Sequence, residues 1–387
     1  MTDFFLYLHI PFCSSKCHFC NWVVDISAHQ LTKSQPLYEE YTSAVLRQID
    51  FYSKALAQQA TRVKAIYFGG GTPTALAARE LETLLSAAVS RFNRSEGFSG
   101  VTIEISPESV DAAKLNHLRH AGFDRLSIGV QSFDNDRLRR MGRAHSREVT
   151  VRAFNEARQA GFENINLDLM LGMPGETFRE WEETLGEGLS LNPDHLSLYV
   201  YRQIPGTVLA GSLDKGRCQP VPPAEVAERY LWASDLLSGM GYREYMFQLF
   251  EKGGKKCDCD LWSFNLQCDY LGFGAGAHSL MSRQLFGHSS DLHKYLAEPT
   301  RPGYAGPVRS AEGVLATKVY HLLHTASGVH YETFNAQLGI SFEQACKQVP
   351  RVRDIYHDLK SKNLTEERAD GFRFRDRETK VRWLCEV

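Results

Sequence analysis

The sequence predicts an α/β protein whose parallel strands form an open or partial barrel, with a small helical domain at its C-terminal end. Six short runs rich in Val, Ile, Leu and aromatic residues alternate with segments of helical periodicity up to about residue 205. Such alternation is typical of a parallel sheet covered by helices. Beyond that point the alternation weakens. The 387 residues also exceed the roughly 100–250 residues of a common single domain, which indicates a large domain with additions.

The six predicted strands and the helices between them follow one another in a regular order. The strands are expected at residues 4–10, 64–70, 101–107, 125–132, 164–172 and 195–202. The helices are expected at residues 37–59, 77–92, 109–120, 146–160 and 177–189, and Gly122 and Gly161 are placed to end two of them. In barrels of this kind the active site lies at the C-terminal ends of the strands.

The chain is expected to divide into three parts. Residues 1–205 form the partial barrel with its cysteine loop, and residues 206–307 extend it with a helix at 224–237 and a glycine-rich segment at 270–279. Residues 308–387 form a small C-terminal domain.

Helical runs at 311–323 and 342–360, with an alternating end at 371–374, suit a helical or winged-helix-like fold for this last part. Its mixed charge favours a lid or docking module over a DNA-binding domain.

The overall charge argues against several partner classes. The 44 basic and 46 acidic side chains give a formal charge of −2, and the chain has no basic stripe or polybasic run, so neither nucleic acid nor an anionic membrane is an expected partner. No apolar stretch approaches the roughly 20 residues that span a bilayer, and the first residues lack the features of a signal peptide. We therefore expect a cytoplasmic protein.

Three of the nine cysteines lie close together after the first predicted strand. Cys13, Cys17 and Cys20 form a C-x3-C-x2-C cluster, and an odd number of cysteines without an export signal favours metal or redox chemistry over disulfides. A structural zinc site needs four ligands, and His18 is the one nearby candidate for the fourth, in a loop that is tight for such a site. Three thiolates instead suit a [4Fe–4S] cluster with one iron open to a ligand.

A glycine-rich segment follows the second predicted strand. Gly70, Gly71 and Thr72 lie in the run 68–74, where consecutive glycines allow the backbone to approach a ligand closely. A plain tight turn is the alternative for a glycine triplet. Its expected position beside the cysteine loop favours a role in ligand binding.

Polar side chains occur inside three of the predicted strands, namely Glu104, Gln131 and Asp168. Because helices cover the outer face of a parallel sheet, the polar set is expected to face the barrel interior. A buried carboxylate is costly without a partner. Internal bonding to Arg125 or Arg143 is one solution, and a bound polar ligand is the other; the recurrence in three strands favours the ligand.

The cysteine loop, with an aromatic residue at Phe19, resembles the cluster loop of the radical S-adenosylmethionine (SAM) superfamily, and residues 9–13, His-Ile-Pro-Phe-Cys, resemble its oxygen-independent coproporphyrinogen oxidase (HemN-like) branch. The resemblance covers about residues 4–280 and is weaker in the C-terminal domain. It implies a [4Fe–4S] cluster held by the three cysteines, two SAM molecules and an electron donor of the flavodoxin or ferredoxin type. Further segments similar to the family lie at residues 125–133, 169–175, 192–197 and 270–278.

Individual positions match residues that contact SAM in that branch. The resemblance places four residues at the SAM that binds the cluster: Tyr7, Gly70, Glu104 and His278. It places six at a second SAM: Gly71, Thr72, Gln131, Arg143, Asp168 and Arg202. Arg202 departs from the family, which has a small residue there.

The chemistry implied by the resemblance is reductive cleavage of SAM to a 5′-deoxyadenosyl radical, and three reactions follow from it. Our preferred prediction is a radical SAM methyltransferase or cyclopropanase of specialised metabolism, in which the radical activates the second SAM for methyl or methylene transfer. The acceptor would be an sp2 carbon of a small molecule, tetrapyrroles included. The alternatives are a heme chaperone of the HemW type and an oxygen-independent coproporphyrinogen III dehydrogenase or other heme-processing enzyme.

The presence of residues for both SAM sites, together with two departures from the related families, favours that prediction. Trp22 stands where the coproporphyrinogen oxidase loop usually has a further cysteine, and Phe264 replaces the histidine of the chaperone's His-Asn-x-x-Tyr-Trp heme motif. Cys268 or a nearby histidine remains a possible substitute for that heme ligand. The segment 251–260 suggests a charged hairpin loop, and we expect Cys257, Cys259 and Cys268 to be free thiols rather than a second metal site.

Overall fold

The computed structural model describes residues 2–22, 24–25, 34–59, 61–264, 268–308 and 311–386. Its main sheet, within these ranges, has twelve strands in the order β12-β11-β10-β9-β1-β2-β3-β4-β5-β6-β8-β7. The strands from β9 to β6 run parallel, and antiparallel strands flank them at both edges. The two edges do not pair with each other, so the sheet is an open barrel. The predicted α/β fold class is confirmed.

The six predicted strands are all present, because each is an apolar run buried on both faces by the sheet's helices and interior. They are β1 (Thr2–Ile10), β2 (Thr61–Gly70), β3 (Val101–Ile105), β4 (Arg125–Gln131), β5 (Asn164–Leu171) and β6 (His195–Val200).

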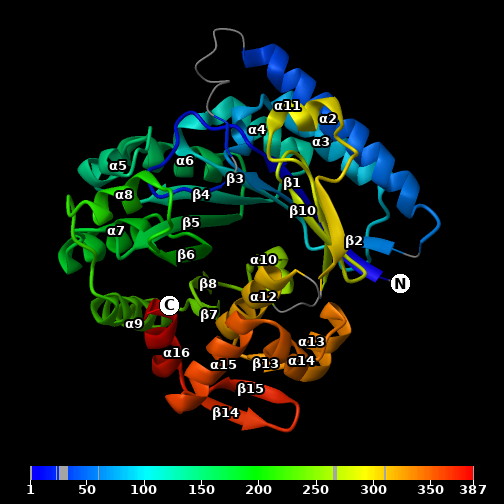
Figure 1. Cartoon of the computed structure of the whole chain (residues 1–387). Coiled ribbons are helices and arrows are strands. Elements are labelled where there is room, and N and C mark those ends of the chain that lie inside the picture. The colour runs from blue at the N-terminus through cyan, green and yellow to red at the C-terminus, as the bar shows by residue number, and fades with distance from the viewer. Residues whose placement is uncertain are drawn as a thin grey trace.

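The crossover helices lie on the outer face of the sheet, with the labels α2, α3, α4, α6 and α7 following its convex side in Figure 1. Asp111, Ser146 and Thr177 cap three of them by accepting a backbone N–H of the first turn, and Gly122 ends one in the left-handed conformation. These helices are α2 (Ser34–Leu56), α3 (Ala78–Arg91), α4 (Ala112–Ala121), α6 (Arg147–Gln159) and α7 (Phe178–Ser190).

Shorter elements complete the barrel at both edges. They are α5 (Asn135–Arg140), α8 (Val208–Asp214), α9 (Pro223–Gly239), β7 (Arg243–Met246), β8 (Leu249–Glu251), α10 (Asp258–Phe264), β9 (Asp269–Phe273), β10 (His278–Met281), β11 (Gln284–Gly287), α11 (Leu292–Ala297) and β12 (Tyr304–Pro307).

The C-terminal elements lie on the open, concave side of the sheet (Figure 1). A second sheet of three antiparallel strands, β13-β15-β14, occurs here. The single predicted helix at 342–360 is two helices, since Pro350 begins a new one. The elements are α12 (Glu312–His324), β13 (Val329–His330), α13 (Tyr331–Leu338), α14 (Phe342–Gln348), α15 (Pro350–Ser361), β14 (Thr365–Arg368), β15 (Gly371–Phe374) and α16 (Arg377–Glu386). The three-part division of the chain stays a prediction.

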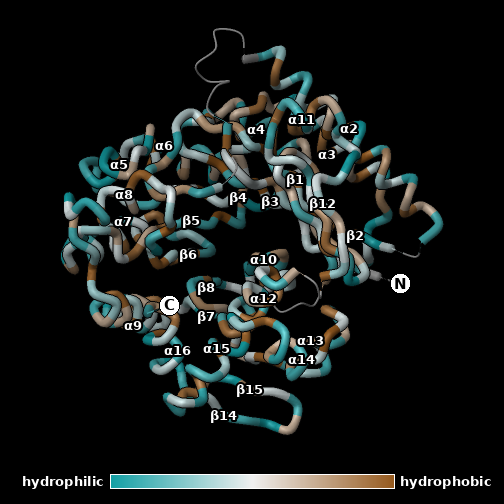
Figure 2. Tube along the Cα trace, in the orientation of Figure 1, coloured by the Kyte–Doolittle hydropathy of each residue, from teal (hydrophilic) through white to brown (hydrophobic). Residues whose placement is uncertain are grey.

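One hydrophobic core connects the barrel with the C-terminal helices. Figure 2 shows hydrophobic residues along the helices and strands of both parts. A separate cluster of Met141, Met170 and Met173 packs against Phe19 of the cysteine loop. Flexible methionines can follow the irregular shape of a loop, so they form its support. Among the residues that the structure describes, no helix combines the length and apolar character that a membrane span requires.

Candidate functional site

A cavity of about 630 Å³ lies at the C-terminal ends of the parallel strands, a volume in the range of ligand pockets. All but one of the predicted site residues line it: Cys13, Cys17, Cys20, Tyr7, Gly70, Gly71, Thr72, Glu104, Gln131, Arg143, Asp168 and Arg202. The exception is His278, which lies exposed on β10 with Nδ1 bonded to the Tyr304 hydroxyl. The cavity therefore brings together side chains from strands far apart in the sequence.

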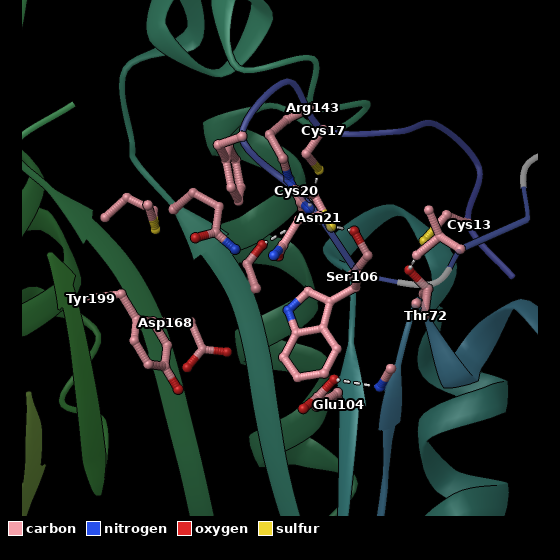
Figure 3. Close-up of a pocket in the computed structure, with 18 of the residues that line it drawn as sticks. Cys13, Cys17, Cys20, Asn21, Thr72, Glu104, Ser106, Arg143, Asp168 and Tyr199 are labelled. Atoms are coloured by element: carbon pink, nitrogen blue, oxygen red, sulfur yellow. Dashed lines mark hydrogen bonds between the residues drawn. The ribbon is translucent and has the colours of Figure 1, made fainter. Parts of the chain in front are cut away.

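The cysteine loop forms one wall of this cavity. Its backbone is held at two points, since the N–H of Cys13 donates to the Asp25 carbonyl over 3.1 Å and the N–H of His18 donates to the Met141 carbonyl over 2.9 Å. Figure 3 shows Cys13 beside Thr72, with Cys17 and Cys20 near Arg143 above Glu104 and Asp168. The three thiols thus surround one end of the cavity.

Two polar side chains lie next to the thiols. The Arg143 guanidinium donates to the Cys17 sulfur over 3.2 Å, and the Thr72 hydroxyl lies 3.6 Å from the Cys13 sulfur. Burial raises the pKa of Cys13 to about 11 and also raises that of Cys20. Because a metal binds the thiolate, loading these cysteines must release protons.

The arrangement fits an iron–sulfur cluster better than a zinc ion. In the described parts of the chain, no group of three or more His, Cys, Asp or Glu side chains converges on a single metal position. Cluster cysteines need not converge, since each binds a different iron. The His18 Nδ1 donates to the Arg140 carbonyl over 2.7 Å, and its ring packs where a Gly142 Cβ would be. Because no such group that includes His18 converges within the described residues, the structure disfavours His18 as a fourth zinc ligand.

The glycine segment brings β2 against the cysteine loop. The N–H of Gly71 donates to the Ile10 carbonyl over 2.8 Å, and the N–H of Thr72 donates to the Phe12 carbonyl over 2.7 Å. A Cβ at Gly71 would lie 2.7 Å from the Phe12 oxygen and 3.0 Å from the Cys13 sulfur. Glycine at this position is what allows the close approach.

Glu104 extends from β3 into the cavity. Its carboxylate accepts hydrogen bonds from the Tyr67 hydroxyl over 2.8 Å and from the Gly70 N–H over 3.2 Å. Enclosure by the protein, added to by the nearby Asp168 charge, raises the pKa of Glu104 from 4.5 to about 8. A cationic group bound here would offset that cost.

This raised pKa predicts a pH-dependent stability of the ligand-free protein. The folded state keeps a proton on Glu104 that the unfolded chain releases above pH 4.5, so stability should fall as pH rises from there to about 8. Glu104→Gln removes this titration. Thermal unfolding between pH 5 and 8 should show the wild type losing about 2 °C or more relative to the variant; parallel melting curves for the two proteins would refute the assignment.

Asp168 and Gln131 lie deeper along the cavity wall. Asp168 accepts from Ser127 Oγ over 3.1 Å and from Asn166 Nδ2 over 2.7 Å, and burial raises its pKa. Gln131 has a φ of 67° at a bulge of β4, which turns the strand end and sets the direction of its side chain. Hydrogen bonds from β4 and β5 therefore hold the Asp168 carboxyl in place.

Arg143 crosses between two strand ends as well as reaching Cys17. Its Nη2 donates to Ser106 Oγ over 2.9 Å and to the Gly129 carbonyl over 2.7 Å. Arg143 was one of the two internal partners that we considered for the strand carboxylates. Its hydrogen bonds go instead to Cys17, to Ser106 and to the Gly129 carbonyl.

Arg202 lines the cavity but points to the C-terminal helices. Its guanidinium donates to the Tyr320 hydroxyl of α12 and to the Leu384 carbonyl of α16. The same wall carries Tyr199, His321 and His324, which the sequence analysis did not identify. The spacing of the two histidines on a helix is a weak signal, since only the packing of α12 onto the barrel directs them to the cavity.

The remaining cysteines lie outside the cavity. The segment expected as a charged hairpin contains the start of α10, where Cys257 and Cys259 are buried, because helix formation at Asp258 turns these thiols inward. Cys268 is also buried, and its thiol donates to the Asp3 carbonyl over 3.2 Å. All three are free thiols. Residues 265–267, within the stretch compared with the heme motif, lie outside the described residues.

Comparisons with known proteins place this site in a family. The model of the radical SAM superfamily matches residues 7–187. The heme chaperone HemW of Bacillus subtilis is 33% identical over 373 residues, which cover 92% of this chain and 91% of that protein. HemW of Escherichia coli is 35% identical over 280 residues, covering 70% and 69%.

Coproporphyrinogen oxidases are similar over less of their length. The oxygen-independent coproporphyrinogen III oxidase of Pseudomonas aeruginosa is 30% identical over 304 residues, which cover 75% of this chain and 64% of that protein. A solved structure of the coproporphyrinogen III oxidase HemN from Escherichia coli matches with a TM-score of 0.77 at 23% identity, covering 100% of this chain and 89% of that chain. This second match supports the fold.

The predicted methyl or methylene transfer is wrong. The relatives that match over most of this chain are named as heme chaperone and coproporphyrinogen oxidase, and neither name describes methylation or cyclopropanation. The prediction rested on residues for two SAM sites and on the loss of two family features. The coproporphyrinogen oxidase branch has two SAM sites as well, and a missing residue does not specify a different chemistry.

Proposed function

Because the chain belongs to the radical SAM superfamily and, within it, to the HemN/HemW-like family, we propose that it is a heme chaperone of the HemW type. Membership brings a [4Fe–4S] cluster and SAM as cofactors. One observation carries the proposal: the similarity to HemW of Bacillus subtilis runs through nearly the whole of both chains. It therefore extends into the C-terminal part of the chain, where α12 contributes to the cavity wall.

The residues of the cavity support distinct parts of this function. Cys13, Cys17 and Cys20 would hold the cluster, with Arg143 donating to one thiolate. Glu104 would bind the ammonium group of SAM, since a cation relieves the cost of its enclosed carboxylate. When bound and reduced, the cluster and SAM supply one-electron cleavage of the sulfonium bond. A flavodoxin- or ferredoxin-type donor remains our proposal for the source of the electron.

A second candidate is the dehydrogenation of coproporphyrinogen. It is favoured by one observation, the 30% identity to the Pseudomonas aeruginosa oxidase over 75% of this chain. That oxidase, however, is covered over 64% of its length, so part of it has no counterpart in this alignment. Both candidates share a tetrapyrrole ligand and differ in whether the chain converts it.

The experiment that separates them uses the full-length protein, purified anaerobically and reconstituted with iron and sulfide. Hemin is titrated while the Soret band is followed, and a parallel sample receives coproporphyrinogen III, SAM and a reductant. We expect saturable binding of about one heme per chain and no decarboxylated product. Turnover of coproporphyrinogen III would establish the second candidate, and absence of heme binding would refute the chaperone.

A further inference from the structure

The C-terminal side of the cavity carries an arginine that has no acidic partner in the described part of the chain. Arg202 lies just after β6, is half-buried and lines the cavity. Its Nη2 donates to the Tyr320 hydroxyl and to the Leu384 carbonyl, which are neutral acceptors. Among the described residues it forms no ion pair with Asp or Glu. Both bonds use one nitrogen, so Nη1 and Nε keep their N–H donors for a ligand.

Tyr320 links this arginine to a second polar side chain. A smaller cavity of about 130 Å³ has Tyr320, Gln248 and Tyr199 in its walls. Gln248 and Tyr199 line the large cavity as well, so the two spaces adjoin. The bond from Arg202 to Tyr320 therefore places the guanidinium on the same side of the cavity as the Gln248 amide.

Gln248 is held by its backbone, whereas its side-chain amide is available. The residue lies between β7 and β8 with a φ of 76°, a left-handed conformation that is unfavourable for a residue with a Cβ. Its N–H donates to the Tyr230 hydroxyl over 2.7 Å, and its carbonyl accepts from the Leu198 N–H over 2.8 Å. Within the described residues, its side-chain amide makes no hydrogen bond. Backbone strain that fixes a side chain at a cavity is typical of functional positions.

The charges of the cavity are separated between its two sides. Glu104 and Asp168 extend from β3 and β5, and Figure 3 shows Asp168 beside Tyr199. Arg143 is occupied by a cluster cysteine, Ser106 and a backbone carbonyl. An anionic ligand group is disfavoured beside the two strand acids and favoured beside Arg202, which offers a charge and N–H donors.

We infer that Arg202 and Gln248 form a carboxylate subsite on the C-terminal side of the cavity, which binds a propionate group of the tetrapyrrole. The inference rests on the proposed heme-chaperone function, because that function supplies the tetrapyrrole. The arginine provides the positive charge, and the Gln248 amide donates a further hydrogen bond. SAM also carries a carboxylate, so the test separates these two sources.

The test uses the full-length, reconstituted protein with two probes, hemin and hemin dimethyl ester, in which both propionates are esterified. Each is titrated by the Soret band in the same dilute detergent without SAM. We expect wild type to bind hemin about tenfold or more tightly than the ester. Arg202→Met should lose this preference because its affinity for hemin falls while its affinity for the ester stays. Gln248→Leu should reduce the preference about threefold or more.

Arg179→Met is the matched control, since Arg179 is an exposed residue of α7 that pairs with Glu183. It should keep the preference of wild type. Arg202→Lys retains the charge and should keep part of the preference. A merely structural role of Arg202, through its bonds to α12 and α16, would weaken the binding of both probes alike.

Three outcomes would overturn the inference and leave the chaperone proposal standing. Wild type could bind hemin and the ester equally, a result that needs no substitution and holds even where a variant does not fold. Folded Arg202→Met and Gln248→Leu could keep the wild-type preference. Arg202→Met could lose affinity for SAM and keep its preference for hemin, which would assign the arginine to a SAM carboxylate. Failure of wild type to bind hemin refutes the chaperone proposal itself.

Discussion

Replacement of Cys13, Cys17 and Cys20 by Ala should leave a folded protein that retains no cluster iron. The three side chains line the cavity from a loop whose backbone bonds, such as Cys13 N–H to the Asp25 carbonyl, do not involve the thiols. Loss of the outer partners of a metal ligand costs about 10–100-fold in affinity, so loss of the ligands themselves should exceed that range. Iron and sulfide content after anaerobic reconstitution measures the effect.

The matched controls are Cys218→Ala and Cys346→Ala, which remove partly buried free thiols outside the cavity. They should keep the iron content of the wild type. Single variants at the three loop positions should each lose most of the cluster. A triple variant with wild-type iron content would show that another part of the chain holds the metal.

The Gly71→Ala variant should lose cluster binding without a change to any cluster ligand. Its new Cβ would lie 2.7 Å from the Phe12 oxygen and 2.9 Å from the Pro11 carbonyl carbon, and backbone atoms cannot rotate away as a side chain can. Overpacking of this kind costs about 1–3 kcal/mol, which corresponds to a loss of about fivefold to 150-fold in cluster affinity. Reconstitution at limiting iron and sulfide, followed by the iron–sulfur absorption, is the measurement.

Gly97→Ala provides the control for the glycine substitution, because a Cβ there would meet no atom within 4 Å. This variant should reconstitute like wild type. Equal cluster content in the Gly71 and Gly97 variants would mean that the approach of β2 to the cysteine loop does not position Cys13.

The fold could be predicted from the sequence where burial imposes a simple pattern. Strands β1 to β6 are mainly apolar runs, with a few polar residues directed to the interior, because both faces are covered, and capping residues such as Asp111 and Thr177 mark the helices. The C-terminal part was harder. Strand β14 has the sequence Thr-Glu-Glu-Arg with three exposed residues, so no apolar alternation shows it.

The candidate site, like the fold, was predicted in part from the sequence. Cysteine spacing and polar residues within strands identified one end of the cavity, since both are local patterns that parallel strands bring to one edge. The other end depends on how α12 packs against the barrel, which no local pattern contains. Arg202 illustrates the limit: its side chain lines the cavity as expected, but its bonds to Tyr320 and Leu384 follow only from the tertiary structure.

The most direct test of the proposed heme-chaperone function is a crystal structure of the reconstituted protein, grown anaerobically with SAM and heme. The account predicts the cluster on Cys13, Cys17 and Cys20, SAM beside Glu104, and the heme in the same cavity. A heme bound outside this cavity, or a structure in which only the cluster and SAM are present at saturating heme, would contradict it.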